Sequence, residues 1–111
     1  MNLIAQARVN AQAGTPVWRG WGFELVERIN TGGPGFYRLT LIERDFELGM
    51  PVSVVPQTNA DVTATYSLQT FGGRDVLAIF TRAAGVSSIE NFSVSVWDNI
   101  DAENANIVVV P

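Results

Sequence analysis

The chain has 111 residues, of which 47% are hydrophobic and 16% are charged, so it is long enough for one folded core and too apolar for a disordered protein. It contains neither cysteine nor histidine, which excludes disulfides, thiolate metal sites, cysteine nucleophiles, and the commonest general base and transition-metal ligand. Eleven acidic residues against seven basic ones give a net charge of −4, which disfavours binding to nucleic acid and to anionic membranes.

No stretch of the sequence reads as a secretion signal or a membrane span. The first ten residues lack the charged start and long apolar run of a signal peptide, and no stretch approaches the roughly 18 to 20 apolar residues of a transmembrane helix. We therefore expect a protein made in the cytoplasm. All seven basic residues are arginine, a residue enriched at protein interfaces, although codon composition explains the absence of lysine equally well.

Alternating apolar and polar residues predict the first strand at residues 3–10, with a short alanine-rich helix as the alternative. A loop follows over residues 11–16, which contain a glycine and a proline. Gly20 and Gly22 flank Trp21 on the way to the next strand. Because glycine inside a strand often marks a bulge or a close approach, this spacing predicts a bend there.

The clearest pattern is a hairpin over residues 21–43, in which the sequence TGGPG at 31–35 joins two alternating segments. The first segment alternates with a period of two, and the residues predicted on its apolar face are Trp21, Phe23, Leu25 and Ile29. The second segment alternates in the same way, and its predicted apolar face consists of Tyr37, Leu39 and Leu41.

Residues 44–50 have no clean period and predict a loop, with a single helical turn as the alternative. A short strand is predicted at residues 52–55. Pro51 and Pro56 flank it, and because proline removes a donor from the ladder, this strand should lie at the edge of a sheet.

The second half of the chain repeats the pattern of strand and turn. Residues 61–69 show the longest clean alternation, and Gly72-Gly73 predicts a hairpin into a further strand at 75–82, both faces of which are apolar enough to be partly buried. Residues 83–88 predict a loop, and residues 92–97 alternate again.

These elements predict about eight strands, with turn signals every 8 to 12 residues or so. This spacing is typical of an all-β fold in which antiparallel strands form a sandwich or a jelly-roll-like barrel. We expect residues 1–111 to form a single domain, of which residues 99–111 are a candidate assembly tail.

Four aromatic residues around the central hairpin are candidates for a binding surface, because exposed aromatic rings anchor interfaces and stack on sugars. They are Trp18, Trp21, Phe36 and Tyr37. Packing in the core is the simpler explanation, since large aromatic side chains supply much of the buried area of a small domain.

Two groups of carboxylates are candidates for a metal site or a catalytic pair. Asp98, Asp101 and Glu103 lie close together in the sequence, but their spacing matches no EF-hand loop, so a solvated acidic loop is favoured over a calcium site. The second group offers the paired carboxylates of a glycosidase without showing their separation. It consists of Glu24, Glu27, Glu43, Asp45 and Glu47. We predict no metal, no cofactor and no hydrolase or transferase activity.

Four segments of the sequence resemble segments of a known protein family. They are GFYRLTL at 35–41, PVSVVPQT at 51–58, VLAIFTRAAG at 76–85 and FSVSVWD at 92–98. In this order they resemble the strands of small β-domains in virion proteins of tailed bacteriophages, especially tail-fibre tips. The resemblance covers roughly residues 20–98. It implies an all-β domain of the virion that forms a homotrimer and acts by binding rather than by catalysis.

The chain differs from a tail fibre because its first predicted strand begins near Met1, without a shaft, a repeat or a virion-anchoring segment. It is therefore more similar to a capsid cement or decoration protein, whose partner is the major capsid protein. A receptor-binding tip of a tail fibre or head fibre is the second expectation. A carbohydrate-binding module or a carboxylate-based glycosidase is a distant third.

The last predicted strand comprises four β-branched residues, Ile107, Val108, Val109 and Val110. Because the segment is uncharged and has high β-propensity, it would promote aggregation if it were left unpaired. It either completes the sheet of its own chain or adds as a strand to a neighbouring subunit. We favour the second use.

Overall fold

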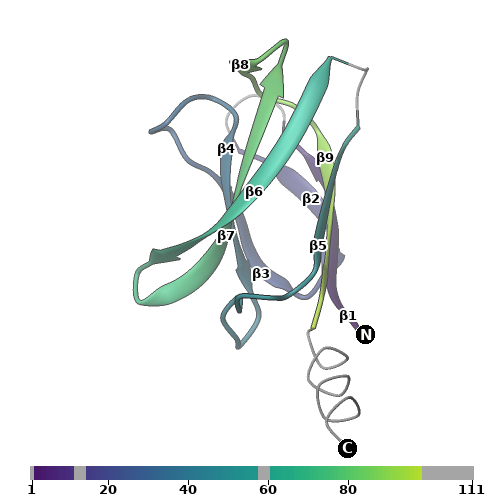
Figure 1. The fold of residues 1–111 in the computed structure, drawn as a ribbon, viewed down its shortest axis with the longest axis vertical. Coiled ribbons are helices and arrows are strands. Elements are labelled where there is room, and N and C mark those ends of the chain that lie inside the picture. Colours follow the sequence, from purple (N-terminus) through teal and green to yellow (C-terminus); the bar gives the residue numbers. More distant parts are fainter. Residues whose placement is uncertain (1, 12–14, 58–60, 99–111) are drawn as a thin grey trace, which may run out of the picture.

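Two antiparallel β-sheets face each other in the structure, a computed structural model that describes residues 2–11, 15–57 and 61–98 (Figure 1). Sheet A has four strands, which in order are β2 (Val17–Trp21), β1 (Leu3–Asn10), β9 (Phe92–Trp97) and β5 (Val52–Pro56). Sheet B has five, in the order β3 (Phe23–Arg28), β4 (Phe36–Leu41), β7 (Arg74–Ala83) and β6 (Val62–Phe71), with the two-residue β8 (Val86–Ser87) beside β7. The predicted all-β sandwich is confirmed.

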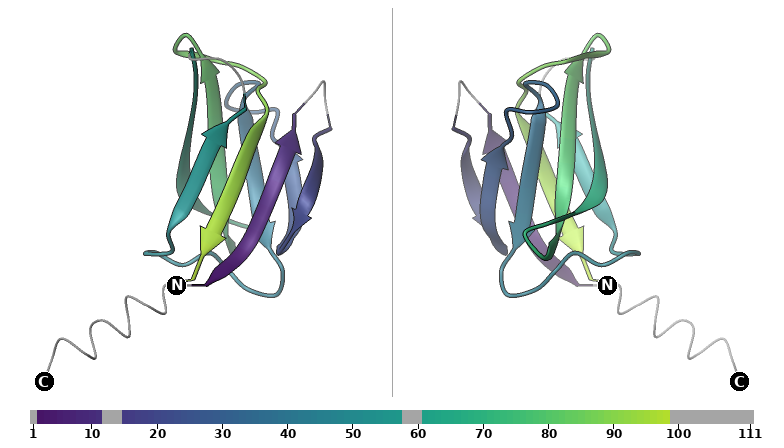
Figure 2. Two further views of the ribbon diagram at one scale, coloured as in Figure 1. Left: turned by 90° about the vertical axis from the view of Figure 1, so that its right-hand side faces the viewer. Right: turned by 90° about the vertical axis from the view of Figure 1, so that its left-hand side faces the viewer.

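The two layers are clearest from the sides of the molecule, where one view looks onto sheet A and the opposite view onto sheet B (Figure 2). No helix long and apolar enough to cross a membrane is found among the residues that the structure describes.

Most strands lie where the alternation predicts them. Residues 3–10 form a strand rather than a helix, and Gly72-Gly73 connects β6 to β7. The strand between the two prolines, β5, is at the edge of sheet A, as expected. Residues 83–88, predicted as a loop, also contain β8, which is too short to give a periodic signal.

The predicted bend at Gly20 and Gly22 is where the chain leaves sheet A for sheet B. β2 ends at Trp21 and β3 begins at Phe23, so a single residue, Gly22, connects the two layers. Gly22 has φ +86°, and a Cβ atom on it would lie 2.4 Å from the carbonyl oxygen of Ile4. The crossing therefore depends on a residue without a side chain.

The predicted apolar face of β3 is wrong beyond Phe23. Phe23 pairs with Leu41 but Leu25 pairs with Thr40, so a bulge shifts the register between Phe23 and Leu25. An extra residue exchanges the two faces of a strand. As a result Val26 is buried and Leu25 is exposed.

The core lies between the sheets. On sheet B the predicted face of β4 is confirmed, since Tyr37, Leu39 and Leu41 are all buried. They pack with buried residues of β1 and β9, and the Tyr37 and Phe92 ring centroids are 5.0 Å apart. Phe46 joins this core from the loop between β4 and β5.

Candidate assembly interface

The most exposed edge of the sandwich is β6. It is the outermost strand of sheet B, and within the described residues it pairs only with β7. The strand is ten residues long and contains no charged residue, proline or glycine. Its residues 65–68 are all exposed. A long, uncharged edge presents free N–H and C=O groups to any strand that approaches it.

The other three edges carry features that discourage strand addition. β5 has five residues, follows Pro51 and ends at Pro56. β2 is equally short, contains Arg19 and Gly20, and runs directly into the bend. β3 is bulged and carries three charged residues, which are Glu24, Glu27 and Arg28. Short length, proline, charge and bulges are the usual protections of edge strands, so the lack of them distinguishes β6.

The side of β6 that faces sheet A is incompletely covered. Tyr66 pairs with Ile79 and Leu68 with Leu77, so both point toward the interior, yet they are 46% and 36% exposed. The facing edge strand, β5, has half the length of β6 and leaves a groove of about 490 Å³. Its apolar lining consists of Leu48, Met50, Val52, Tyr66 and Leu68.

Leu48 is held at the rim of this groove by the turn on which it lies. The Met50 N–H donates to the Glu47 carbonyl at 3.1 Å, and the Phe46 N–H donates to the Asp75 carbonyl at 3.0 Å. The Phe46 and Met50 side chains are buried, whereas Leu48 between them is 90% exposed. Two anchored neighbours therefore fix an apolar side chain in solvent, an arrangement that suits a partner surface.

The same loop is fastened from the other side by Arg74. Its guanidinium lies 2.8 Å from Glu24 Oε2 and 3.3 Å from Asp45 Oδ1, and it also donates to the carbonyls of Leu41 and Arg44 at 2.9 Å. These four contacts use four of the five N–H donors of the guanidinium. They join the first residues of the loop to the β6–β7 hairpin.

At the C-terminal end of β6, the ring of Phe71 stacks with an arginine of β4. The Arg38 guanidinium carbon lies 3.6 Å from the ring centroid of Phe71, which is 55% exposed, and the rings of Phe36 and Phe80 stack nearby with centroids 4.8 Å apart. Such cation–π contacts stabilise an exposed ring in one place.

The structure separates the four aromatic candidates from one another. Tyr37 is entirely buried, and Phe36 lies under Phe80 and close to Arg38, so neither presents a free ring. Trp18 packs edge-to-face on Phe23 with centroids 6.3 Å apart and belongs to the margin of the core. Trp21 alone of the four is exposed, on sheet A. The rings of Tyr37 and Phe36 are buried and that of Trp18 is partly buried, which agrees with packing, the simpler of the two explanations given for these residues.

Burial raises the pKa of the Tyr37 hydroxyl above its ordinary value of 10.0, and the nearby Thr81 and Glu90 backbone lower it by less. The unfolded chain therefore ionises at lower pH than the folded chain, so the stability contributed by neutral Tyr37 is complete below pH 10.0 and is lost as the pH rises through the raised pKa. We expect Tyr37→Phe to flatten this alkaline loss. Urea unfolding between pH 8 and 11 measures it, with Tyr66→Phe as the control that keeps the wild-type slope.

Three of the carboxylate candidates form ion pairs. Glu24 and Asp45 converge on Arg74, and Glu47 lies 3.8 Å from Arg44, so these three are engaged in ion pairs. Asp98 is buried, and its backbone N–H donates to the Asn2 carbonyl at 2.9 Å. No cluster of three metal-ligating side chains occurs in residues 2–11, 15–57 and 61–98. Asp101, Glu103 and the segment Ile107–Val110 lie outside the described residues.

Sequence reasoning did not single out β6, Leu48 or Phe71 as surface features. The uncharged composition of residues 62–71 was visible, but its meaning depends on an edge position that alternation does not reveal. Comparisons with protein-family models, with curated proteins and with solved structures find no match to this chain.

Proposed function

We propose that this chain is a structural protein of a tailed-phage virion, a capsid cement or decoration protein that binds the capsid lattice without catalysis and forms a homotrimer. The observation that carries the proposal is the unprotected edge of β6 beside its apolar groove. The strand pattern that resembles phage β-domains supports the same reading. Such an edge suits a protein that assembles, because strand addition supplies main-chain hydrogen bonds between chains.

The number of copies on a virus particle tests whether the protein belongs to the capsid or to the tail. Electron microscopy of particles that carry the protein should find many copies on the capsid surface. A few copies at a tail would contradict the cement proposal and favour a receptor-binding tip.

We expect Ser67→Lys to dissociate the trimer. Ser67 is exposed in the middle of β6, and a lysine there must lose hydration when a second strand pairs with this edge. Light scattering at micromolar concentration should give a trimer mass for the wild type and a monomer mass for the variant. At a concentration where both proteins are monomeric, the free energy of unfolding should change by no more than about 0.5 kcal/mol, as is usual for surface substitutions.

Ser53→Lys is the matched control, because Ser53 is an exposed serine on the proline-flanked edge strand β5. It should leave the trimer intact. A monomeric wild type would contradict the homotrimer, and a Ser67→Lys variant that stays trimeric would contradict the role of β6.

For the strand that β6 receives, we propose the uncharged segment Ile107–Val110 of a neighbouring copy. A head-to-tail contact of this kind closes a ring of three when its rotation fits. Deletion of residues 107–111 should then reproduce the monomer mass seen with Ser67→Lys. If the deletion lowers only the thermal stability, the segment is instead a strand of its own chain.

A further inference from the structure

Sheet A carries an unusual distribution of charge. Its four strands contain no aspartate and no glutamate, and their only charged residues are Arg8 and Arg19. The chain as a whole has eleven acidic residues and a net charge of −4. Sheet A is therefore a positive face on a negative protein.

The two arginines are direct neighbours across the β1–β2 ladder. Arg8 pairs with Arg19 in the register, and both side chains are exposed on the outer face of the sheet. Like charges directly opposite each other destabilise a pair of strands. Neither guanidinium has an ion pair or hydrogen bond with another residue in the part of the chain that the structure describes. Each of the two side chains is therefore available to bind an anion.

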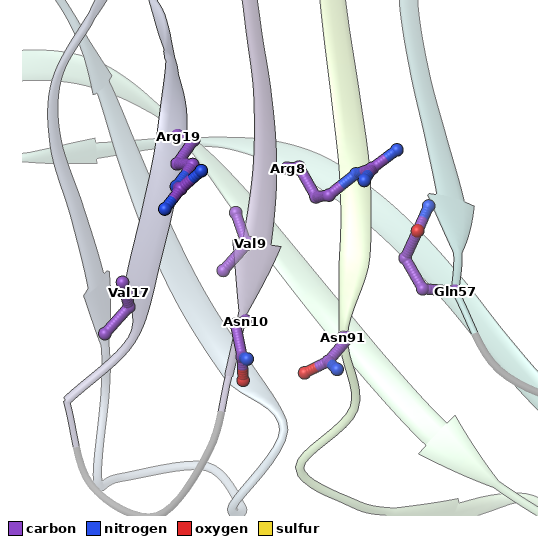
Figure 3. A pocket seen from close by; sticks show the side chains of 7 residues that line it. All are labelled: Arg8, Val9, Asn10, Val17, Arg19, Gln57 and Asn91. Carbon is purple, nitrogen blue, oxygen red and sulfur yellow. The ribbon is translucent and has the colours of Figure 1, made fainter.

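The arginines border a continuous depression in this face. A hollow of about 420 Å³ is lined by both arginines together with Gln57 and Asn91, and in Figure 3 Arg8 extends across β9 toward Gln57 while Arg19 remains over β2. A second hollow of about 270 Å³ shares both arginines and ends at Trp21. The two hollows meet at the arginine pair and form one groove across β2, β1 and β9.

The amide side chains of the groove have fixed orientations. Asn91 Oδ1 accepts a hydrogen bond from the Ala11 N–H at 2.9 Å, so its NH₂ group remains available to donate. Gln57 Nε2 donates to Ser93 Oγ at 2.6 Å, so its carbonyl oxygen remains available to accept. The groove thus offers cationic donors for an anion, and a neutral donor and a neutral acceptor for hydroxyl groups.

Trp21 adds a flat apolar surface at one end of the groove. Trp21 lies two residues after Arg19 and pairs with Gln6, which lies two residues before Arg8. The Trp21 side chain is 49% exposed. An aromatic ring beside amide groups suits the face of a sugar ring, and the guanidinium fork suits a carboxylate. Nucleic acid fits less well, because two arginines on a net negative protein neutralise few phosphates.

We propose that this groove binds an acidic saccharide, with carboxylates of different sugar units held by Arg8 and by Arg19, hydroxyl groups bound by Asn91 and Gln57, and a sugar ring stacked on Trp21. The site lies on the sheet opposite β6 and is independent of the proposed assembly edge.

Calorimetric titration of the full chain with a galacturonate trisaccharide at low salt tests the site. The wild type should bind, and Arg8→Gln and Arg19→Gln should each weaken binding about tenfold or more, the usual cost of a lost hydrogen bond to a charged group. Arg82→Gln, which removes the same charge from an exposed position of β7, should bind like the wild type. Trp21→Ala should weaken binding of the trisaccharide as well.

Two further measurements separate the alternatives. Without saccharide, Arg19→Gln should raise the melting temperature, since it removes the repulsion across the ladder. A neutral galactose trisaccharide should not bind. The proposal is overturned if the galacturonate trisaccharide does not bind, if binding survives the loss of both arginines, or if triglutamate binds equally tightly, which would indicate an acidic peptide. The mass of the assembly should be unchanged in all these variants, so failure here leaves the β6 proposal intact.

Discussion

Gly22→Ala should abolish stable folding at room temperature. The new Cβ atom would lie 2.4 Å from the Ile4 carbonyl oxygen and 2.6 Å from the Ala5 Cα, both backbone atoms of the adjacent strand that cannot move without opening sheet A. The φ of +86° adds a further cost of about 1 kcal/mol. We expect a total loss of at least about 4 kcal/mol, most of the stability of a marginal small domain.

Gly85→Ala is the matched control. Gly85 has a nearly identical φ of +81°, but apart from its chain neighbours no atom of the described residues lies within 4 Å of the position of its Cβ. Urea unfolding followed by tryptophan fluorescence should therefore show a loss of only about 1 kcal/mol for this variant. Equal losses for the two variants would mean that backbone conformation, and not the contact between strands, determines the requirement for glycine at the bend.

Phe46→Ala should cost about 3 to 5 kcal/mol, the usual range for a buried phenylalanine. Phe46 is 1% exposed and, together with Met50, anchors the loop between β4 and β5 in the core. Thermal unfolding measures the loss. The variant should also release Leu48 from the rim of the apolar groove, because the turn that holds Leu48 begins next to Phe46.

Leu48→Ala, two residues away, separates stability from assembly. Its side chain is almost fully exposed, so its removal should change the free energy of unfolding of the monomer by no more than about 0.5 kcal/mol. Light scattering should nevertheless show weaker association, since the groove beside β6 loses its most exposed apolar residue. Unchanged association would remove Leu48 from the proposed interface, and a large loss of stability would show that the turn depends on it.

Alternation predicted the strands of sheet A well because the sheet has one buried and one solvated face, as the burial of β1 and β9 shows, whereas β4 and β7 in the centre of sheet B are buried on both faces. It placed β1, β6 and β9 and the hairpin between β3 and β4. It failed within β3, where one bulged residue exchanges the faces of Leu25 and Val26 and leaves no mark on composition. Local sequence does not specify a bulge that depends on the neighbouring strand.

The surfaces were harder to predict than the strands, because a surface depends on which strands become neighbours. The prolines around β5 revealed its edge position, whereas β6 has no such signal and its edge position follows only from the strand order. Arg8 and Arg19 are eleven positions apart in the sequence, and only the β1–β2 register makes them opposite neighbours. The sequence allowed the four aromatic residues either to pack in the core or to form a surface, and it could not distinguish the exposed Trp21 from the partly buried Trp18.

The place of β9 in sheet A bears on how the protein is made. β9 lies between β1 and β5, so sheet A consists of two unconnected parts until residues 92–97 join it. The strands of sheet B need nothing beyond residue 87. During synthesis, sheet B can therefore assemble first. Until β9 is made, β1 and β2 form only a hairpin, in which one side of β1 is unpaired. Pairings that span about ninety residues, such as Leu3 with Trp97, are formed slowly. The chain is thus most exposed to wrong partners just before its last described strand leaves the ribosome.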